Sequence, residues 1–151
     1  GNLFICAIEE SCEESIRTKQ FELTADSDFK QALQLMCQRA LSIIYLPEAL
    51  KLDCLLFELA AEQSPLTQQF FDASHTRMCH VWCDFFEQAI AFKFIQADAP
   101  LKQTELIISL MLGIRHQQVL LGLAPVPTAN EIDQIIQHAI EIFLLKYQPT
   151  I

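Results

Sequence analysis

Apolar side chains recur at intervals of three and four residues along most of this chain, with polar residues between them. That spacing places apolar side chains on one face of an α-helix, whereas a half-buried strand alternates at every second position. No segment alternates convincingly with a period of two. The pattern therefore predicts an all-α fold made of six helices.

Capping residues and prolines indicate where several of these helices begin. Ser27 or Asp28 can cap the second helix, because a short polar side chain accepts a hydrogen bond from the first turn. Pro47 and Pro65 fit the first turns of the third and fourth helices, where no backbone N–H is needed. These four residues divide the first half of the chain into helices of ordinary length.

The later boundaries follow from similar signals. Pro100 follows the end of the fourth helix, and Gly122 is a suitable C-cap for the fifth. Thr128 and Glu131 have the spacing of a capping box at the start of the sixth. The predicted helices cover residues 2–18, 28–45, 47–63, 65–95, 101–121 and 128–147.

The last two predicted helices are more apolar than one core requires. The fifth contains LIISLMLGI and VLLGL, and the sixth is polar only along one narrow stripe. A helix packed on a single core normally keeps a polar opposite face, so this pair is expected to meet its own copy in a dimeric four-helix bundle. The alternative is that neighbouring helices cover the pair. The residues expected at the dimer interface are Leu110, Ile114, Leu121, Ile132, Ile136, Ala139, Ile140 and Phe143.

Composition narrows the class of protein. The 151 residues are 52% hydrophobic and 19% charged, which is typical of one globular domain covering 1–151. Three glycines are too few for a sandwich, a Rossmann domain or a P-loop. The net charge of −9 disfavours binding of this chain alone to nucleic acid or to an anionic membrane.

Six cysteines raise the question of a disulfide framework. All six fall inside helix-like segments, and no signal peptide precedes them, so we expect free thiols in a reducing cytoplasm. The longest uncharged apolar stretch, 106–114, is far shorter than the roughly 20 residues that a membrane span needs. The cysteines are therefore expected to pack as small hydrophobic residues.

The order of these features resembles the C-terminal ligand-binding and dimerisation domain of TetR/AcrR-type transcriptional regulators. The resemblance covers essentially the whole chain and rests on apolar spacing and helix breaks. The segments that carry it are NLFICAIEE, LFELAAEQSPLTQQFF, ADAP, LMLGIRHQQVLLGL and PTANEIDQIIQHAIEIFLLKY. It implies a bacterial, cytoplasmic, homodimeric regulator, expected to be a repressor, that binds a small hydrophobic effector and needs no cofactor.

Regulators of this type begin with a helix-turn-helix module that reads DNA in the major groove. This chain begins at the helix that normally follows that module, so the resemblance implies DNA binding only through a missing N-terminal part. The chain is then a fragment or a relative that lacks the module, and the poor cap before Asn2 favours a fragment. In such regulators the effector shifts the helices that carry the DNA-binding modules; here these would be the first and fourth.

The resemblance also implies an effector pocket enclosed by the helices from the first to the fifth. Arg115, His116 and Gln118 are polar candidates in the otherwise apolar fifth helix. The expected pocket residues are Cys37, Leu41, Phe57, Phe71, His75, Met78, Trp82, Phe86, Arg115 and Gln118. The alternative is that the aromatic residues only form core. Arg115 needs a partner, which Glu58, Asp84 or an anionic ligand could supply.

Neither a metal site nor an active site is expected. His75, Cys79 and Cys83 lie in a row on one helix, but about 12 Å separates the first from the last, too far for one zinc ion. No nucleophile elbow, zinc-binding helix motif or glycine-rich loop occurs. The competing interpretation is a stand-alone helical binding or scaffold protein, or a cysteine-based redox or metal sensor.

Overall fold

The computed structural model describes residues 22–149, which form five helices joined by short loops. Within this range there is no strand, which confirms the predicted all-α class. The predicted first helix, 2–18, lies outside the described residues. The helices are α2 (Phe29–Ile44), α3 (Pro47–Ala61), α4 (Leu66–Ala91), α5 (Pro100–Leu120) and α6 (Ala129–Tyr147).

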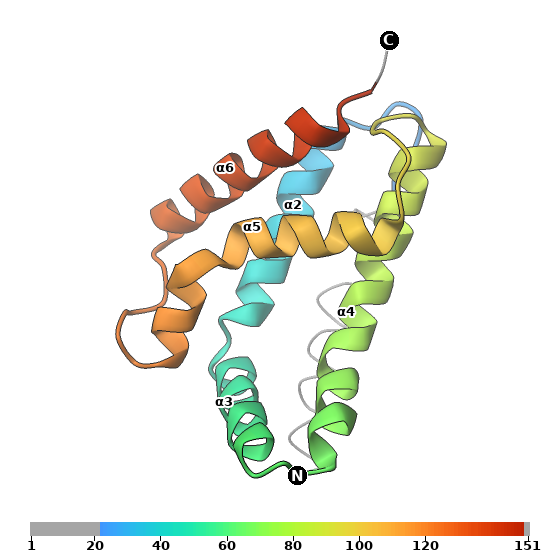
Figure 1. Cartoon of the computed structure of the whole chain (residues 1–151). Helices are drawn as coiled ribbons and strands as arrows, with labels where there is room; N and C mark the ends of the chain where they lie inside the picture. Colours follow the sequence, from blue (N-terminus) through green and yellow to red (C-terminus); the bar gives the residue numbers. More distant parts are fainter. Residues whose placement is uncertain (1–21, 150–151) are drawn as a thin grey trace.

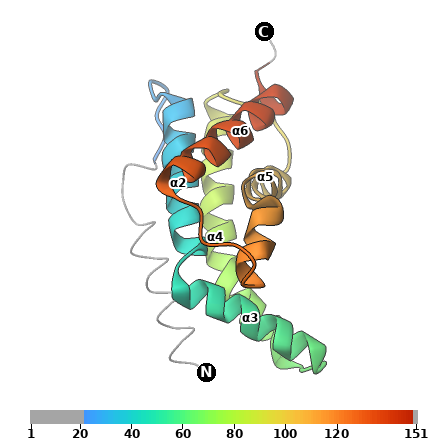
Figure 2. The same ribbon diagram turned by 90° about the vertical axis from the view of Figure 1, so that its left-hand side faces the viewer.

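α2 and α4 make one layer of the fold, and α5 and α6 cross in front of it (Figures 1 and 2). α3 runs from the lower end of α2 across the bottom of the molecule and extends past α5 in Figure 2. α5 packs mainly on α4, and α6 packs on α2 and on α5. The layers meet in one aromatic-rich core, in which Phe29 of α2 stacks on Phe85 of α4 and Phe86 of α4 stacks on Phe143 of α6.

The predicted helix starts are correct because their signals are local. The Asp28 carboxylate accepts a hydrogen bond from the Gln31 backbone N–H, and Pro47 occupies the first turn of α3. At α6 the hydroxyl of Thr128 accepts from the Glu131 N–H while the Glu131 carboxylate accepts from the Thr128 N–H. Each of the five described helices therefore begins within one residue of its predicted start, although Pro65 is the N-cap of α4 and does not lie in its first turn.

One predicted end is wrong. α4 ends at Ala91 rather than near residue 95, so it has 26 residues instead of about 30. Lys93 adopts a left-handed conformation with φ 62°, and the N–H groups of Lys93 and Phe94 return to the carbonyls of Ile90 and Ala89. This is a Schellman motif, which glycine usually builds. Because a lysine and not a glycine occupies this position, no residue near Ala91 indicated in the sequence that the helix ends there.

α5 is interrupted in its second half. Gly113 has φ 50° and ψ −151°, outside the helical region, so the two halves of α5 meet at a kink. Only glycine adopts such a backbone conformation without steric strain. The kink lies between Leu112 and His116, and both of these residues face the cavity described next.

Candidate functional site

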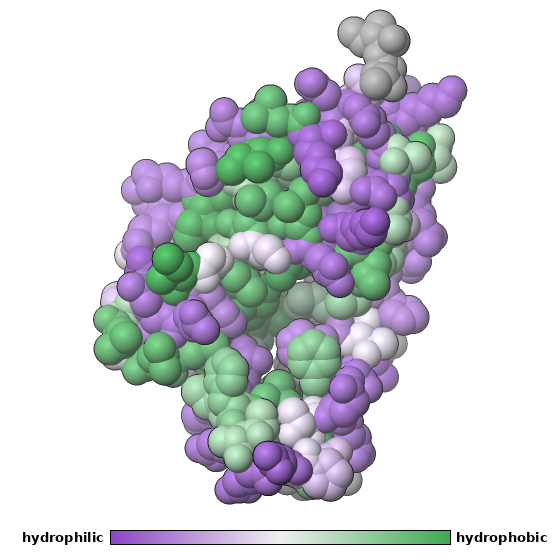
Figure 3. All heavy atoms as spheres, in the orientation of Figure 1, coloured by the Kyte–Doolittle hydropathy of each residue, from purple (hydrophilic) through white to green (hydrophobic). Residues whose placement is uncertain are grey.

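A cavity of about 120 Å³ lies where the end of α2, α3, α4 and α5 meet. Figure 3 shows the hollow below α5, between α3 and α4, with hydrophobic side chains around it. Its wall is mostly aliphatic and carries a few polar groups, which is the usual composition of a small-molecule site. The lining residues are Ile43, Ile44, Ala49, Leu52, Asp53, Ser74, His75, Met78, Ile108, Leu112 and His116.

Three of these residues form a polar cluster at the cavity. Asp53 comes from α3, His75 from α4 and His116 from α5. Nε2 of His116 lies 3.7 Å from Oδ2 of Asp53, and only 16% and 22% of the two side chains are exposed. Nδ1 of His75 lies 2.6 Å from the Ser74 hydroxyl and 3.1 Å from the Phe71 carbonyl oxygen.

Burial governs the ionisation of this cluster. It raises the pKa of Asp53, and the neighbouring His75 and His116 oppose part of that rise. Burial also lowers the pKa of His116, against the opposing effect of Asp53. Such perturbed pairs, held beside a cavity, occur more often at functional sites than elsewhere.

Two buried polar atoms near the cluster have no hydrogen-bond partner among the described residues. These atoms are Nε2 of His116 and the hydroxyl oxygen of Tyr45. The Tyr45 and His116 rings meet edge to face, with their centroids 5.7 Å apart. A buried polar group without a partner costs free energy, and His116 lines the cavity whereas Tyr45 does not. The Nε2 atom of His116 is therefore available to a ligand or to ordered water.

The ten predicted pocket residues are not brought together. His75 and Met78 line the cavity, but Cys37, Leu41, Trp82 and Phe86 are buried in the core. Phe57 and Phe71 are large exposed residues, and Gln118 is also exposed. For the four core residues the alternative interpretation, ordinary packing, describes their positions.

Arg115 finds a partner that the sequence did not suggest. Its Nη1 lies 2.8 Å from Oε2 of Glu131 on α6, and its Nε donates to the carbonyl oxygen of Pro125. Neither Glu58 nor Asp84 supplies the contact. Arg115 therefore connects α5 to the start of α6 and does not line the cavity.

Sequence reasoning missed Asp53 as a site residue, and it named His116 as a polar candidate but left it out of the expected pocket residues. A signal for Asp53 was present, because it is the single acidic residue within the apolar run KLDCLLF of α3. The sequence near Asp53 could not show that His116 faces it, because the two residues belong to different helices. Only the packing of α3 against α5 brings them together.

The eight residues predicted for a dimer interface differ in exposure. Ile114 and Leu121 are 76% and 69% exposed, whereas Leu110 and Ile132 are partly buried against the core. Four others are buried within the single chain: Ile136, Ala139, Ile140 and Phe143. Those four side chains pack in the chain's own core.

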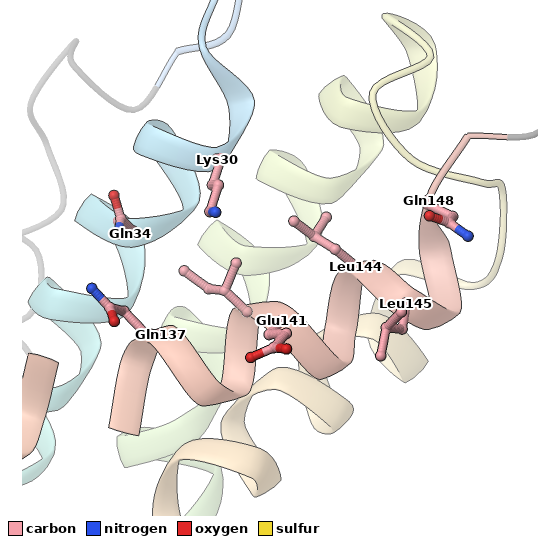
Figure 4. A pocket seen from close by; sticks show the side chains of 8 residues that line it. Lys30, Gln34, Gln137, Glu141, Leu144, Leu145 and Gln148 are labelled. Carbon is pink, nitrogen blue, oxygen red and sulfur yellow. The ribbon is translucent and has the colours of Figure 1, made fainter. Parts of the chain in front are cut away.

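A second, larger depression runs between α2 and α6, with a volume of about 550 Å³. Figure 4 shows Lys30 and Gln34 on its α2 side and Gln137 and Glu141 on its α6 side. Lys30, Gln137 and Glu141 are exposed, so this depression is an open groove with solvated polar groups. The smaller cavity, which encloses buried polar atoms, is the stronger candidate for a ligand site.

The cysteine row offers no metal site in the described part of the chain. No three His, Cys, Asp or Glu side chains within residues 22–149 come together in a way that could hold an ion. Cys37 is buried, and Cys54, Cys79 and Cys83 are half-buried free thiols. Cys6 and Cys12 lie outside the described residues.

Comparison with known proteins identifies the fold's family. The model of the family described as "AefR-like transcriptional repressor, C-terminal domain" matches residues 31–149, most of the chain. The chain belongs to this AefR-like family. The AefR-like domain is thus a non-enzymatic part of a TetR-type transcriptional regulator. This confirms the resemblance to the C-terminal domain of TetR/AcrR-type regulators that the sequence showed. No curated protein matches it.

Two solved structures share the fold of the AefR-like domain. One is a protein from Mesorhizobium loti assigned to the TetR family of transcriptional regulators, with a TM-score of 0.79 and 18% identity over 95% of this chain and 69% of that one. The other is the flavonoid-responsive regulator FrrA, with a TM-score of 0.75 and 21% identity over 99% of this chain and 75% of that one. No helix among residues 22–149 of the AefR-like domain has the length and apolar character needed to cross a membrane.

Proposed function

We propose that this domain binds a small, mainly apolar effector in the cavity between α2, α3, α4 and α5, and so controls a transcriptional repressor. The observation that carries the proposal is the enclosed Asp53–His116 pair, whose buried Nε2 has no partner among the described residues. A polar group in this state is satisfied when a ligand completes its hydrogen bonds. One neighbour of the same fold, FrrA, is described as responsive to flavonoids, which agrees with an effector role.

The kink in α5 offers a route by which the effector acts on the rest of the domain. Leu112 and His116 line the cavity on either side of Gly113, and Arg115 joins the same segment to Glu131 of α6. A ligand that contacts both sides of the kink favours one arrangement of the two halves of α5. A shift in that equilibrium requires only that the ligand bind the two arrangements with different affinities.

Toluene is a suitable first probe of the cavity, because it is small, apolar and uncharged. Toluene is expected to raise the melting temperature of the 151-residue chain by mass action. Ala49→Phe fills the cavity from α3 and is expected to abolish this effect, since Ala49 lines it. Ala60→Phe is the matched control, because Ala60 is exposed on the same helix. Equal responses of the two variants would contradict a site in this cavity.

We also propose that the domain forms a homodimer through the exposed apolar surface at the end of α5. Ile114, Leu121 and Leu123 are each more than two-thirds exposed. Figure 3 shows hydrophobic side chains gathered over α5 and α6 on the same face. Large exposed apolar patches on a globular domain usually mark an interaction surface.

Sedimentation velocity at micromolar concentration tests this interface. Ile114→Glu is expected to give monomers, because the contact would bury an unpaired charge. Gln117→Glu, an exposed position on the same helix, is the control and should leave the dimer intact. A monomeric wild-type chain would refute the dimer, and a dimeric Ile114→Glu variant would place the interface elsewhere. DNA binding is proposed only for a regulator that carries a helix-turn-helix module in addition to this domain.

A further inference from the structure

We propose that the cavity selects a neutral, hydroxyl-bearing molecule of single-ring size, whose hydroxyl group bridges His116 and Asp53. This inference rests on the proposed effector site and specifies the chemical class of its ligand. It follows from the volume of the cavity, from the gap between two polar atoms, and from the aliphatic wall around them.

The volume sets the size of the ligand. An apolar cavity of roughly 150 Å³ in a protein interior binds benzene. The cavity here has about 120 Å³ and is not completely closed, so it accommodates a single six-membered ring with a small substituent. Ring systems of two or three fused or linked rings need the several hundred Å³ of ordinary ligand pockets.

The gap between His116 and Asp53 calls for a group that both accepts and donates a hydrogen bond. The 3.7 Å that separates Nε2 of His116 from Oδ2 of Asp53 is too long for a direct hydrogen bond. A hydroxyl oxygen accepts from Nε2–H in one tautomer of the imidazole, and its O–H donates to the carboxylate. One hydroxyl thereby satisfies the buried Nε2 and gives the carboxylate a donor.

The same surroundings disfavour charged ligands. A carboxylate ligand would stand beside the Asp53 carboxylate and be repelled by it. An ammonium ligand would pair with Asp53, but it carries three donors. The rest of the wall is largely aliphatic, with Leu52 and Ile108 among its residues, so the remaining donors would be poorly satisfied. A hydroxyl has a single donor and avoids this cost.

Isothermal titration of the 151-residue chain with four ring compounds tests the proposal. Phenol and toluene have nearly the same shape and differ by a hydroxyl against a methyl group. Benzoate and benzylammonium add a negative and a positive charge. Phenol is expected to bind at least about tenfold more tightly than toluene, because it gains hydrogen bonds to a charged group and to a buried imidazole. Both charged compounds are expected to bind more weakly than phenol.

Two variants connect the preference to the named residues. Asp53→Asn is expected to reduce the affinity for phenol about tenfold and to leave the affinity for toluene nearly unchanged. Asp133→Asn, an exposed acid on α6, is the matched control and should keep the wild-type preference. If Asp53→Asn does not fold, His116→Phe removes the other hydrogen-bonding partner and retains a ring of similar size.

The outcomes separate this inference from the effector site itself. Toluene binding as tightly as phenol would overturn the hydroxyl preference while the cavity remained a binding site. Tightest binding of benzylammonium or benzoate would overturn the preference for a neutral ligand. If none of the four compounds binds, and native mass spectrometry of the purified chain finds a larger adduct, the size class is wrong although an effector is bound.

Discussion

The Arg115 guanidinium on α5 and the Glu131 carboxylate on α6 form an ion pair, with 2.8 Å between Nη1 and Oε2. Glu131 also completes the capping box of α6, and Arg115 also holds the Pro125 carbonyl of the preceding loop. One pair of side chains therefore fixes the α5–α6 connection and the first turn of α6.

Arg115→Met is expected to lower the melting temperature of the domain by a few degrees, because the loop and the α6 cap both lose a partner. The loss should shrink at high salt, since the pair is partly exposed. Thermal unfolding at low and at high ionic strength measures both effects. Arg39→Met, an exposed arginine on α2, is the control. Equal losses of melting temperature in the two variants would show that the Arg115–Glu131 ion pair does not stabilise the domain.

The Glu131 contacts also give the stability a defined pH dependence. Hydrogen bonds from Arg115 and from the Thr128 backbone lower the pKa of Glu131 below its ordinary value of 4.5. The resulting stabilisation is complete above that ordinary value and is lost as the pH falls through the lowered pKa. Glu131→Gln is therefore expected to be less stable than wild type at pH 7 and to approach it in acid. Urea unfolding at both pH values tests this, and a pH-independent difference would contradict it.

Asp53→Asn is expected to stabilise the domain at pH 7, whereas Glu131→Gln destabilises it. Burial raises the pKa of Asp53 above 3.8, so ionisation of this carboxyl costs stability once the pH has risen through the folded-state pKa. The variant removes the cost and should melt up to a few degrees higher than wild type at pH 7. The difference should vanish below pH 3.8, where Asp53 is protonated in both states. A less stable variant at pH 7 would mean that the carboxylate is needed for packing.

Gly113→Ala tests the kink in α5. Its φ of 50° with ψ −151° is strained for any residue with a Cβ, so the variant is expected to lose about 1–3 kcal/mol. A methyl group at this position would meet no heavy atom within 4 Å, so the loss reports backbone strain alone. Gly122→Ala, at the left-handed residue that follows the C-cap Leu121, should cost less, about 1 kcal/mol. If both substitutions have the same small effect, α5 can straighten without cost.

A substitution at Phe143 tests whether this residue belongs to the core of one chain or to an interface between two copies. Its side chain is fully buried in one chain and stacks on Phe86, so Phe143→Ala should cost about 3–5 kcal/mol of unfolding free energy whatever the oligomeric state. Leu145→Ala on the same helix, at a residue 68% exposed, should change it by less than about 0.5 kcal/mol if no partner covers it. Denaturation across a range of protein concentrations measures both. A concentration-dependent loss at Phe143 would place it in a contact between copies.

Thiol reactivity should follow burial. Burial raises the pKa of Cys37 far above its ordinary value, so little thiolate forms and little reagent reaches it. Alkylation of the native chain followed by mass spectrometry of its peptides should label the half-buried Cys54 before Cys37. Rapid labelling of Cys37 would show that α2 opens readily.

The sequence determined the five helices of residues 22–149 and most of their boundaries, because caps, prolines and apolar spacing act within a few residues. Asp28, Pro47 and the Thr128–Glu131 capping box begin helices in the structure, and Gly122 follows α5 in a left-handed conformation. The end of α4 was missed because Lys93 adopts the conformation that glycine normally provides. Lysine is not typical of the left-handed position that ends a helix, so its presence does not predict a helix end.

Tertiary structure alone decided which side chains meet. Periodicity identifies an apolar face but not what covers it, so Phe143 and Ile114 were both assigned to an interface although one is buried and the other exposed. Asp53 meets His116, and Arg115 meets Glu131, only because α3 and α6 each pack against α5. Such contacts depend on how helices pack across the core, and the local propensities that the sequence displays do not specify that packing.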